Sequence, residues 1–284
     1  MDKILIHSTT EQALNLLLQG DHHAVGLIGP YGAGKSYLAY WLACKFLDVA
    51  KPSINQVKEI WPEKNSIGID AVRNIQSTLK LKAPGSQKIR RVIIIHDAQN
   101  LTVEAQNALL KILEEPPEDV RIIMTSVSQK ALLPTVESRL HHVNVLPIQL
   151  RELYSAYSTH VDQATINKAY AISGGYAGLC LGILENADHT LIRSIEQAKT
   201  LFGEKPYDRL LQVDQLSRDK EKVRSLLFAI KRVQIAVAEK AALQHQTTTL
   251  LKIQASLRAV LNAEAKIDHN PNLKLLVTDV LLQL

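Results

Sequence analysis

Residues 24–36 read Ala24-Val25-Gly26-Leu27-Ile28-Gly29-Pro30-Tyr31-Gly32-Ala33-Gly34-Lys35-Ser36, a short apolar run followed by a loop rich in glycine. The loop, residues 29–36, fits the pattern G-x-x-x-x-G-K-[ST] in full. The apolar run predicts a β-strand and a helical pattern over residues 35–47 follows, so the motif has the strand–loop–helix setting that it requires. The stretch therefore predicts an α/β domain with a phosphate-binding loop.

The residue types in this loop indicate how a nucleotide would be held. Glycines let backbone N–H groups turn onto phosphate oxygens, and the positive end of the following helix adds to the attraction. Lys35 is expected to reach the β- and γ-phosphates, and the Ser36 hydroxyl to hold a magnesium ion. We therefore predict a site for ATP or ADP with Mg²⁺, formed by Gly29, Pro30, Tyr31, Gly32, Ala33, Gly34, Lys35 and Ser36.

Outward from this loop, short apolar runs alternate with helical patterns. The runs span residues 24–28, 57–60, 92–95, 121–125 and 142–146, and helical patterns span residues 35–47, 69–81 and 103–115. Such alternation predicts a parallel sheet covered by helices on both faces. After residue 150 the strand signal fades and helical periodicity takes over. We predict three domains: a sheet domain over residues 1–148, a small helical domain over 149–203 and an all-helical domain over 204–284.

Composition narrows the setting without deciding the function. A net charge of +5 permits contact with nucleic acid but also suits an ordinary protein surface. No stretch approaches the roughly 20 apolar residues of a membrane helix, and the N-terminus lacks the pattern of a signal peptide, so we expect a cytoplasmic protein without membrane contact. The two cysteines, Cys44 and Cys180, are too few for a four-thiolate zinc site and are predicted to be buried thiols.

Hydrolysis of a bound nucleotide needs more than the loop. An acidic residue at the end of a neighbouring strand helps to hold the metal, and a further group positions water. The predicted strand over residues 91–95 ends in His96-Asp97. Magnesium prefers oxygen ligands, which His96 lacks, and Asp97 offers a short carboxylate without an acidic neighbour. The sequence therefore predicts nucleotide binding with weak or absent hydrolysis, with Asp97 as the candidate acid.

The residues around this strand resemble one family. Residues 94–98, IIHDA, and 101–117, LTVEAQNALLKILEEPP, are similar to the bacterial clamp-loader subunits of DNA polymerase III, which are AAA+ proteins. Further similar segments lie at residues 66–73, 122–126, 133–140 and 270–273, so that the resemblance covers nearly the whole chain. It implies an AAA+ P-loop sheet domain, a helical lid domain and an all-α collar domain that mediates oligomerisation.

Within that family the chain is most similar to the delta-prime type, with gamma/tau next. His96-Asp97 replaces the Asp-Glu pair of the active ATPases, and Gly178 stands where gamma/tau subunits carry a sensor-2 arginine. The family's zinc module is missing, since residues 45–62 contain no cysteine, and no zinc site is expected. The delta-prime type resembles an ATPase without being the motor, so the resemblance implies a structural subunit with little or no ATPase activity alone.

The resemblance also implies roles for single residues. Arg139 is expected to be an arginine finger, donated in trans to the γ-phosphate on a neighbouring subunit, and a planar, always charged guanidinium suits that task. Thr125 and Ser126 match the sensor-1 tip, which faces the γ-phosphate. The expected partners are gamma/tau and delta subunits in a hetero-oligomer and, through that assembly, the sliding clamp and primer–template DNA.

Two other functions stay open at this point. One is an active gamma/tau-like motor in which Asp97 serves as the catalytic acid. The other is a different AAA+ replication protein, an initiator or a helicase loader, against which the run NALLKILEEPP argues. Nucleotide turnover by the isolated chain would separate a motor from a non-motor subunit.

Overall fold

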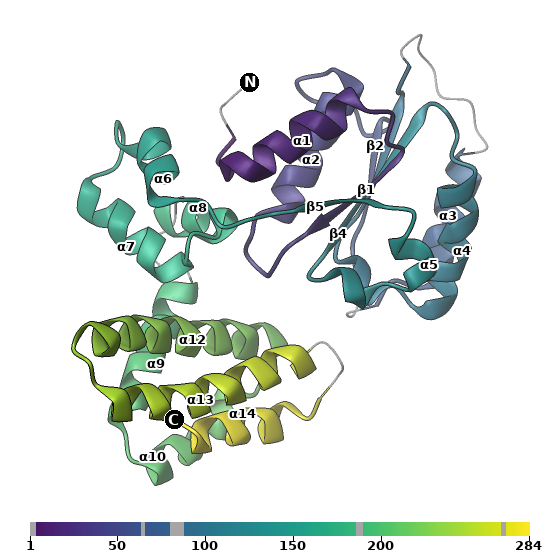
Figure 1. Ribbon diagram of the computed structural model, residues 1–284. Coiled ribbons are helices and arrows are strands. Elements are labelled where there is room, and N and C mark those ends of the chain that lie inside the picture. The colour runs from purple at the N-terminus through teal and green to yellow at the C-terminus, as the bar shows by residue number, and fades with distance from the viewer. Residues whose placement is uncertain (1–3, 64–65, 80–87, 186–189, 268–270) are drawn as a thin grey trace. The chain divides into compact units, whose positions relative to one another are not determined.

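The computed structural model describes residues 4–63, 66–79, 88–185, 190–267 and 271–284 (Figure 1). The chain divides into two compact units. Unit 1 comprises residues 1–166 and 175–179, and unit 2 comprises residues 167–174 and 180–284. The division cuts the chain at other places than the predicted domain boundaries after residues 148 and 203, which stay predictions.

Unit 1 is built on a five-stranded parallel sheet. The strands are β1 (Ala24–Ile28), β2 (Val57–Ile60), β3 (Arg91–Ile95), β4 (Val120–Ser126) and β5 (His141–Asn144), in the spatial order β2-β3-β4-β1-β5. All four neighbouring pairs are parallel. The alternation of apolar runs and helical patterns correctly predicted this sheet. All five predicted runs start within one residue of an observed strand, and four of them also end within one residue. The central strands β1, β3 and β4 are buried along their whole length, as expected for a sheet covered on both faces.

Two hydrophobic layers cover the sheet. Helices α1 (Ser8–Gln19) and α2 (Lys35–Leu47) pack on one face, where Leu38 and Leu42 meet Leu27 of β1. Helices α3 (Ile69–Leu79) and α4 (Val103–Glu114) cover the other face, where Leu109 joins a core with Ile93. Figure 1 shows the two helix pairs on opposite sides of the strands. The short helices η1 (Ala98–Asn100), η2 (Gln129–Ala131) and α5 (Pro134–Glu137) and the helix α6 (Leu150–Tyr157) complete the unit.

Helix α4 carries the run that the family resemblance rests on, and its ends follow from local chemistry. The Thr102 side chain caps its first turn by accepting a hydrogen bond from the backbone of Ala105 at 3.2 Å. Its last turn ends before Pro116 and Pro117, because proline lacks the N–H that a continuing helix needs. The helix thus runs from the carboxyl end of β3 back toward the amino ends of the strands.

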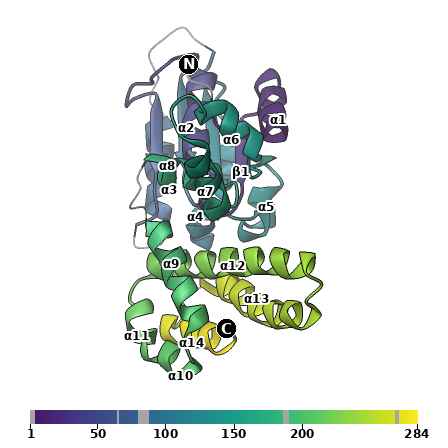
Figure 2. The ribbon, with the colours of Figure 1, turned by 90° about the vertical axis from the view of Figure 1, so that its left-hand side faces the viewer.

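Unit 2 is helical throughout its described residues. Its elements include most of α7 (Gln163–Ser173) and α8 (Ala177–Glu185), then α9 (Thr190–Gly203), α10 (Pro206–Leu211), α11 (Val213–Leu216), α12 (Lys220–Leu243), α13 (Thr247–Lys266) and α14 (Leu273–Leu282). Figure 2 shows the long helices α12 and α13 beside each other. Val223, Leu226 and Ile230 are buried and recur at helical spacing, so they form one apolar face of α12. The predicted α/β class, a parallel sheet domain followed by helical segments, is confirmed.

Two remaining expectations about the chain concern cysteines and membranes. Cys44 and Cys180 are both free and buried, as predicted. Burial raises the pKa of the Cys180 thiol to about 11, so this group is an inert part of the helical core. Among the described residues, no helix is long and apolar enough to cross a membrane.

Candidate nucleotide site and a separate arginine

The phosphate loop has the backbone shape that its glycines allow. Gly32 and Gly34 take positive φ angles of 79° and 89°, a region that residues with a Cβ rarely enter, and Gly34 caps the start of α2. Gly29 donates its N–H to the carbonyl of Ser126 on the neighbouring strand β4, at 3.1 Å. The loop therefore joins the carboxyl end of β1 to the amino end of α2, where backbone N–H groups and the helix dipole favour an anion.

Lys35 supplies the positive charge of this cradle. Its side chain is 8% exposed, and its ammonium donates hydrogen bonds to the carbonyls of Gly29 at 2.8 Å and Pro30 at 3.0 Å. An ammonium held over the loop by neutral carbonyls can exchange them for phosphate oxygens, which form stronger, charge-assisted hydrogen bonds. The residues present thus fit the phosphates of a nucleotide, and Ser36 follows Lys35 in the first turn of α2.

The start of α8 lies directly on the loop. Leu179 donates its N–H to the carbonyl of Gly32 at 3.2 Å. A Cβ added to Gly178 would lie 2.9 Å from that same carbonyl oxygen and 3.1 Å from the backbone nitrogen of Gly34. Residue 178 therefore has no room for a side chain without movement of the backbone around it. The sequence indicates only that Gly178 stands where related subunits have an arginine. The structure shows that the small size of Gly178 lets α8 pack against the loop.

Thr125 and Ser126, the predicted sensor residues, lie at the tip of β4 next to the loop. Thr125 is opposite Leu27 and Ser126 opposite Ile28, the last two residues of β1. Both side chains are buried, and both are engaged within the chain. Thr125 Oγ1 accepts the N–H of Asp97 at 2.9 Å, and Ser126 Oγ donates to the carbonyl of Ser128 at 2.9 Å. The tip of β4 thus links the loop to the segment after β3.

His96 and Asp97 diverge after β3. The His96 ring is 1% exposed, stacks on Trp61 with 3.6 Å between ring centroids, and places Nε2 2.9 Å from Glu59 Oε2. A carboxylate can only accept, so Nε2 must carry the proton of a neutral imidazole. Burial lowers the pKa of His96, although the hydrogen bond to Glu59 opposes the shift. Since Glu59 and Trp61 belong to β2 and the residue after it, the ring is tied to the side of β3 remote from β1.

Asp97 faces a different surrounding. Its backbone is left-handed, with φ 48° and ψ 52°, and its N–H is bonded to Thr125 of β4, the strand that separates β3 from β1. Its carboxylate accepts a hydrogen bond from the Gln99 amide at 3.3 Å. The structure therefore brings Asp97, the sensor residues and the phosphate loop to one edge of the sheet, where the carboxyl ends of the strands meet.

Arg139 lies at the other edge of the sheet. It follows α5 and precedes His141, the first residue of β5, and His141 pairs with Val25 near the amino end of β1. The guanidinium donates to the carbonyl of Thr135 at 2.7 Å, and its Nη2 lies 2.6 Å from Oε1 of Glu114 at the end of α4. The structure thus separates Arg139 from the other predicted site residues instead of grouping it with them.

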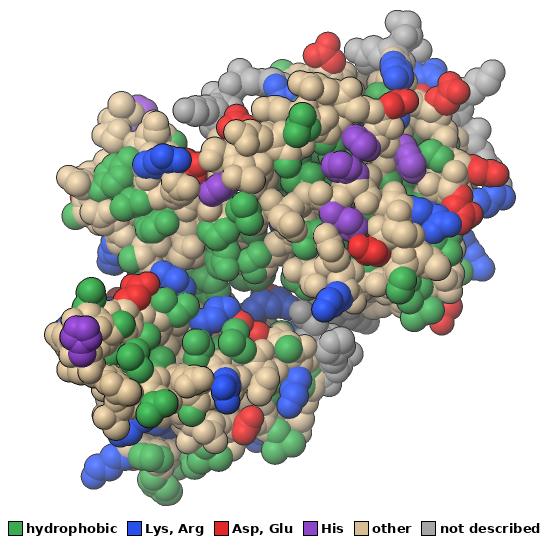
Figure 3. All heavy atoms as spheres, in the orientation of Figure 1, with side chains coloured by type: hydrophobic (Ala, Val, Ile, Leu, Met, Phe, Trp, Pro, Cys, Tyr) green, Lys and Arg blue, Asp and Glu red, His purple; other side chains and the backbone are tan. Residues whose placement is uncertain are grey.

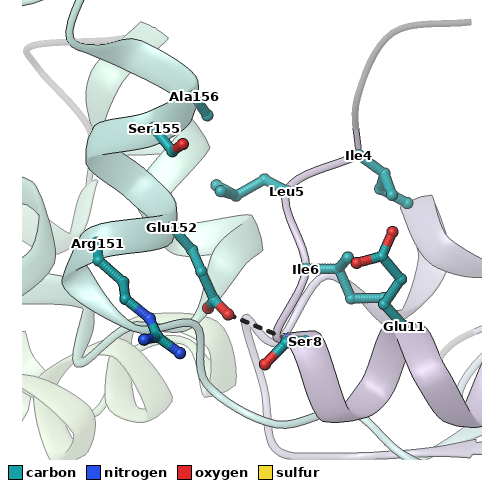
Figure 4. Close-up of a pocket in the computed structure, with 9 residues that line it drawn as sticks. All are labelled: Ile4, Leu5, Ile6, Ser8, Glu11, Arg151, Glu152, Ser155 and Ala156. Atoms are coloured by element: carbon teal, nitrogen blue, oxygen red, sulfur yellow. Dashed lines mark hydrogen bonds between the residues drawn. The ribbon is translucent and has the colours of Figure 1, made fainter.

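Unit 1 also contains a pocket that the sequence patterns do not predict (Figure 4). It has a volume of about 370 Å³ and lies between the N-terminal segment, with Ile4, Leu5 and Ile6, and helix α6, with Arg151 and Ser155. Glu152 joins its two walls: one carboxylate oxygen accepts the N–H of Ser8 at 3.1 Å, and the other accepts the N–H of Gln149 at 2.7 Å. Figure 4 shows Leu5 pointing toward α6. No motif in the sequence indicates these residues.

Histidine side chains, purple in Figure 3, gather on one face of unit 1. The rings of His22 and His141 lie 4.1 Å apart between centroids, tilted by 35°. Burial lowers the pKa of His141, and the nearby His22 and His142 lower it further. Within the part of the chain that the structure describes, no group of three or more His, Cys, Asp or Glu side chains could hold a metal ion. On this face, the rings of His22 and His141 thus contact each other.

Comparison with known proteins identifies relatives of this chain. Residues 42–149 match the protein family described as DNA polymerase III, delta subunit. The DNA polymerase III subunit delta' of Escherichia coli (strain K12) is 33% identical over 124 residues, which are 43% of this chain and 36% of that protein. The DNA polymerase III subunit tau of Bacillus subtilis (strain 168) is 28% identical over 203 residues, 63% of this chain and 36% of that protein.

A solved structure and the extent of these matches complete the comparison. A DNA polymerase III gamma subunit-related protein from Thermotoga maritima MSB8 covers 96% of this chain and 97% of its own, with 22% identity and a TM-score of 0.47. The chain spans 36% of the length of each of the two curated relatives named above. The family match contains Asp97, Thr125, Ser126 and Arg139 and begins after the phosphate loop. The resemblance of this chain to the clamp-loader subunits of DNA polymerase III is thereby confirmed.

Proposed function

We propose that the chain is a delta-prime-like subunit of the DNA polymerase III clamp loader. It binds ATP or ADP with Mg²⁺ at its own loop, turns it over poorly, and donates Arg139 to the nucleotide of a neighbouring ATPase subunit while the sliding clamp is loaded onto DNA. The observation that carries this proposal is the position of Arg139 at the edge of the sheet opposite the phosphate loop.

The length of the strands supports action of Arg139 in trans over action in cis. His141 is level with Val25, and Arg139 lies in the turn before His141, while the loop begins at Gly29. At roughly 3.3 Å per residue, the four steps from Val25 to Gly29 span on the order of 13 Å, and Arg139 comes before the start of β5. That span exceeds the length of an arginine side chain. If Arg139 contacts a γ-phosphate, the phosphate belongs to another subunit.

The chain's own nucleotide site supports binding more than turnover. Lys35, the left-handed glycines and Ser36 would hold the phosphates and the magnesium ion, and the bound nucleotide would supply charge that orders the loop. Thr125 already accepts a backbone N–H, and His96 is tied to β2. Asp97 is then the carboxylate available to the metal, and the Gly178 position offers no cation for the γ-phosphate. Such a site favours a structural or regulatory nucleotide.

The helical unit offers surface for the partner subunits. Tyr207 and Leu211 of α10 are exposed, as is Leu275 of α14, and α10 and α14 contact each other. Exposed large apolar side chains on touching helices favour contact with another protein surface. We infer that these residues belong to the collar that joins gamma/tau and delta subunits. The sliding clamp and primer–template DNA would then be reached through the assembly, in the cytoplasm.

A reconstituted loader tests the arginine finger. All ATPase subunits except the one that adjoins Arg139 would carry a disabled phosphate-loop lysine, so that one active site reports. Arg139→Ala is expected to leave assembly intact, as seen by gel filtration, and to lower turnover at that site about 10³-fold or more, because the transition-state charge loses its partner. Arg139→Lys keeps the charge but lacks the planar guanidinium. Its turnover should lie between those of the wild type and Arg139→Ala. Unchanged turnover in Arg139→Ala would contradict the proposal.

An active motor is the alternative, favoured by the intact loop and by the Asp97 carboxylate on the same sheet edge. It predicts turnover by the isolated chain well above background, abolished by Asp97→Ala. The non-motor proposal predicts binding of nucleotide by the same sample without such turnover. An initiator or a helicase loader has less support, since the relatives of residues 42–149 are subunits of DNA polymerase III.

A further inference from the structure

The guanidinium of Arg139 is held from three directions. Nη1 donates to the carbonyl of Thr135 at 2.7 Å and to the hydroxyl of Ser138 at 3.3 Å, both within its own turn. Nη2 donates to Oε1 of Glu114 at 2.6 Å. Glu114 is the contact that comes from a different element and the one that carries a charge. It therefore fixes the direction in which the guanidinium points away from α5.

Glu114 is itself well anchored. It is the last residue of α4, whose next-to-last residue, Leu113, has its carbonyl 2.9 Å from Nε2 of His23. Leu113 is also buried in the core beneath α3 and α4, and Pro116 and Pro117 end the helix. A carboxylate on such a fixed helix end can orient a long, flexible side chain that would otherwise sample many rotamers.

The pair is also open enough to exchange. The Arg139 and Glu114 side chains are 33% and 49% exposed, so water and salt screen their attraction. A phosphate offers the guanidinium more charge and more acceptor oxygens than one carboxylate. A neighbour's nucleotide can therefore take over Nη2 while Thr135 and Ser138 keep holding Nη1.

We propose that Glu114 is a positioning residue for Arg139, which orients the guanidinium toward the partner subunit and releases Nη2 to the incoming phosphate. This inference rests on the proposed trans role of Arg139. Glu115 is the matched control, because it is the adjacent glutamate at the same helix end and takes part in no ion pair in the described part of the chain. Glu137, the acidic residue two positions before Arg139, lies 3.4 Å from the His142 ring instead.

The test uses the one-site loader described above and reads kcat and KM for ATP separately. Glu114→Ala is expected to lower kcat roughly 5- to 10-fold with KM unchanged, since misplacement of a reacting group weakens the transition state more than substrate binding. Glu114→Gln keeps an oxygen acceptor and should restore part of kcat. Glu115→Ala should match the wild type. In the Arg139→Ala background, Glu114→Ala should cause no further loss, because its effect passes through Arg139.

The outcomes separate this inference from the function on which it rests. If Arg139→Ala lowers turnover while Glu114→Ala and Glu114→Gln behave as the wild type, Glu114 positions nothing and the proposed function stands. An additive loss in the double variant, or a loss matched by Glu115→Ala, also overturns the positioning role. If Arg139→Ala does not change turnover, the proposed trans role of Arg139 is wrong, and the positioning role of Glu114 is wrong with it. Gel filtration of every complex shows whether it assembles, and Glu114→Gln, which preserves shape, carries the test if Glu114→Ala does not.

Discussion

The ends of β1 and β3 lie on the same edge of one sheet, but they are equipped differently. The loop after β1 has two glycines with positive φ angles and a buried lysine, and it leads directly into the amino end of α2. After β3, His96 turns to Glu59 and Trp61, and the backbone of Asp97 is held by Thr125. The first end is built for phosphate, whereas the second lacks the pair of acids that prepares metal and water. Under the proposed function, binding of a nucleotide and its cleavage are therefore separable.

Among the changes at the two strand ends, loss of the loop lysine is expected to have the largest effect, which is on nucleotide affinity. Lys35→Ala removes the charge that meets the phosphates, and hydrogen bonds to charged groups contribute about 1.5–3 kcal/mol. The affinity for ATP with Mg²⁺ should therefore fall roughly 10- to 150-fold, measured by calorimetry on the isolated chain. Lys45→Ala, at the far end of the same helix and 5.4 Å above the Trp41 ring, is the control and should bind as the wild type. Equal affinity in Lys35→Ala would place the nucleotide elsewhere.

The sequence predicted the first end more fully than the second. Backbone conformation dictates the residues of the loop, so the pattern of residues 29–36 carries its own geometry. The direction of the His96 ring depends on Glu59 and Trp61, which are 37 and 35 positions away in the chain and meet it only once the sheet forms. Likewise, the ion pair between Arg139 and Glu114 joins residues 25 positions apart. Long-range side-chain contacts of this kind leave no periodic trace.

Gly178 also distinguishes the phosphate loop after β1, because its lack of a side chain lets the start of α8 pack against that loop. Gly178→Ala puts a Cβ 2.9 Å from the carbonyl oxygen of Gly32, a backbone atom that cannot swing aside. Overpacking of this kind costs about 1–3 kcal/mol, and we expect the start of α8 to separate from the loop. The amide of Leu179, bonded to that carbonyl at 3.2 Å, should then exchange with deuterium roughly 5- to 150-fold faster.

Gly68→Ala is the matched control for that experiment. A Cβ added to Gly68 meets nothing within 4 Å, so the substitution should leave the exchange of the Leu179 amide as in the wild type. If Gly178→Ala exchanges at the wild-type rate, the contact between α8 and the loop is looser than the structure shows. The role of residue 178 would then reduce to the absence of an arginine.

The smallest expected effect concerns His96, at the end of β3. It changes how the free energy of unfolding depends on pH. Burial lowers the pKa of His96 below its ordinary value of 6.5, so the folded protein holds the ring neutral where the unfolded chain takes up a proton. Below about pH 6.5 the unfolded state binds more protons, and the free energy of unfolding must fall as the pH falls toward the folded pKa. Above that range the contribution of His96 to stability is complete.

His96→Gln removes this titration while an amide can still donate to Glu59. Urea unfolding between about pH 7.5 and pH 5 should therefore show a shallower loss of stability than the wild type, with a remaining slope from His141, whose pKa is also lowered. An unchanged slope in His96→Gln would mean that the ring titrates as freely in the folded state as in the unfolded chain. The contacts with Glu59 and Trp61 would then not hold it, and the contrast between the two strand ends would rest on residue type alone.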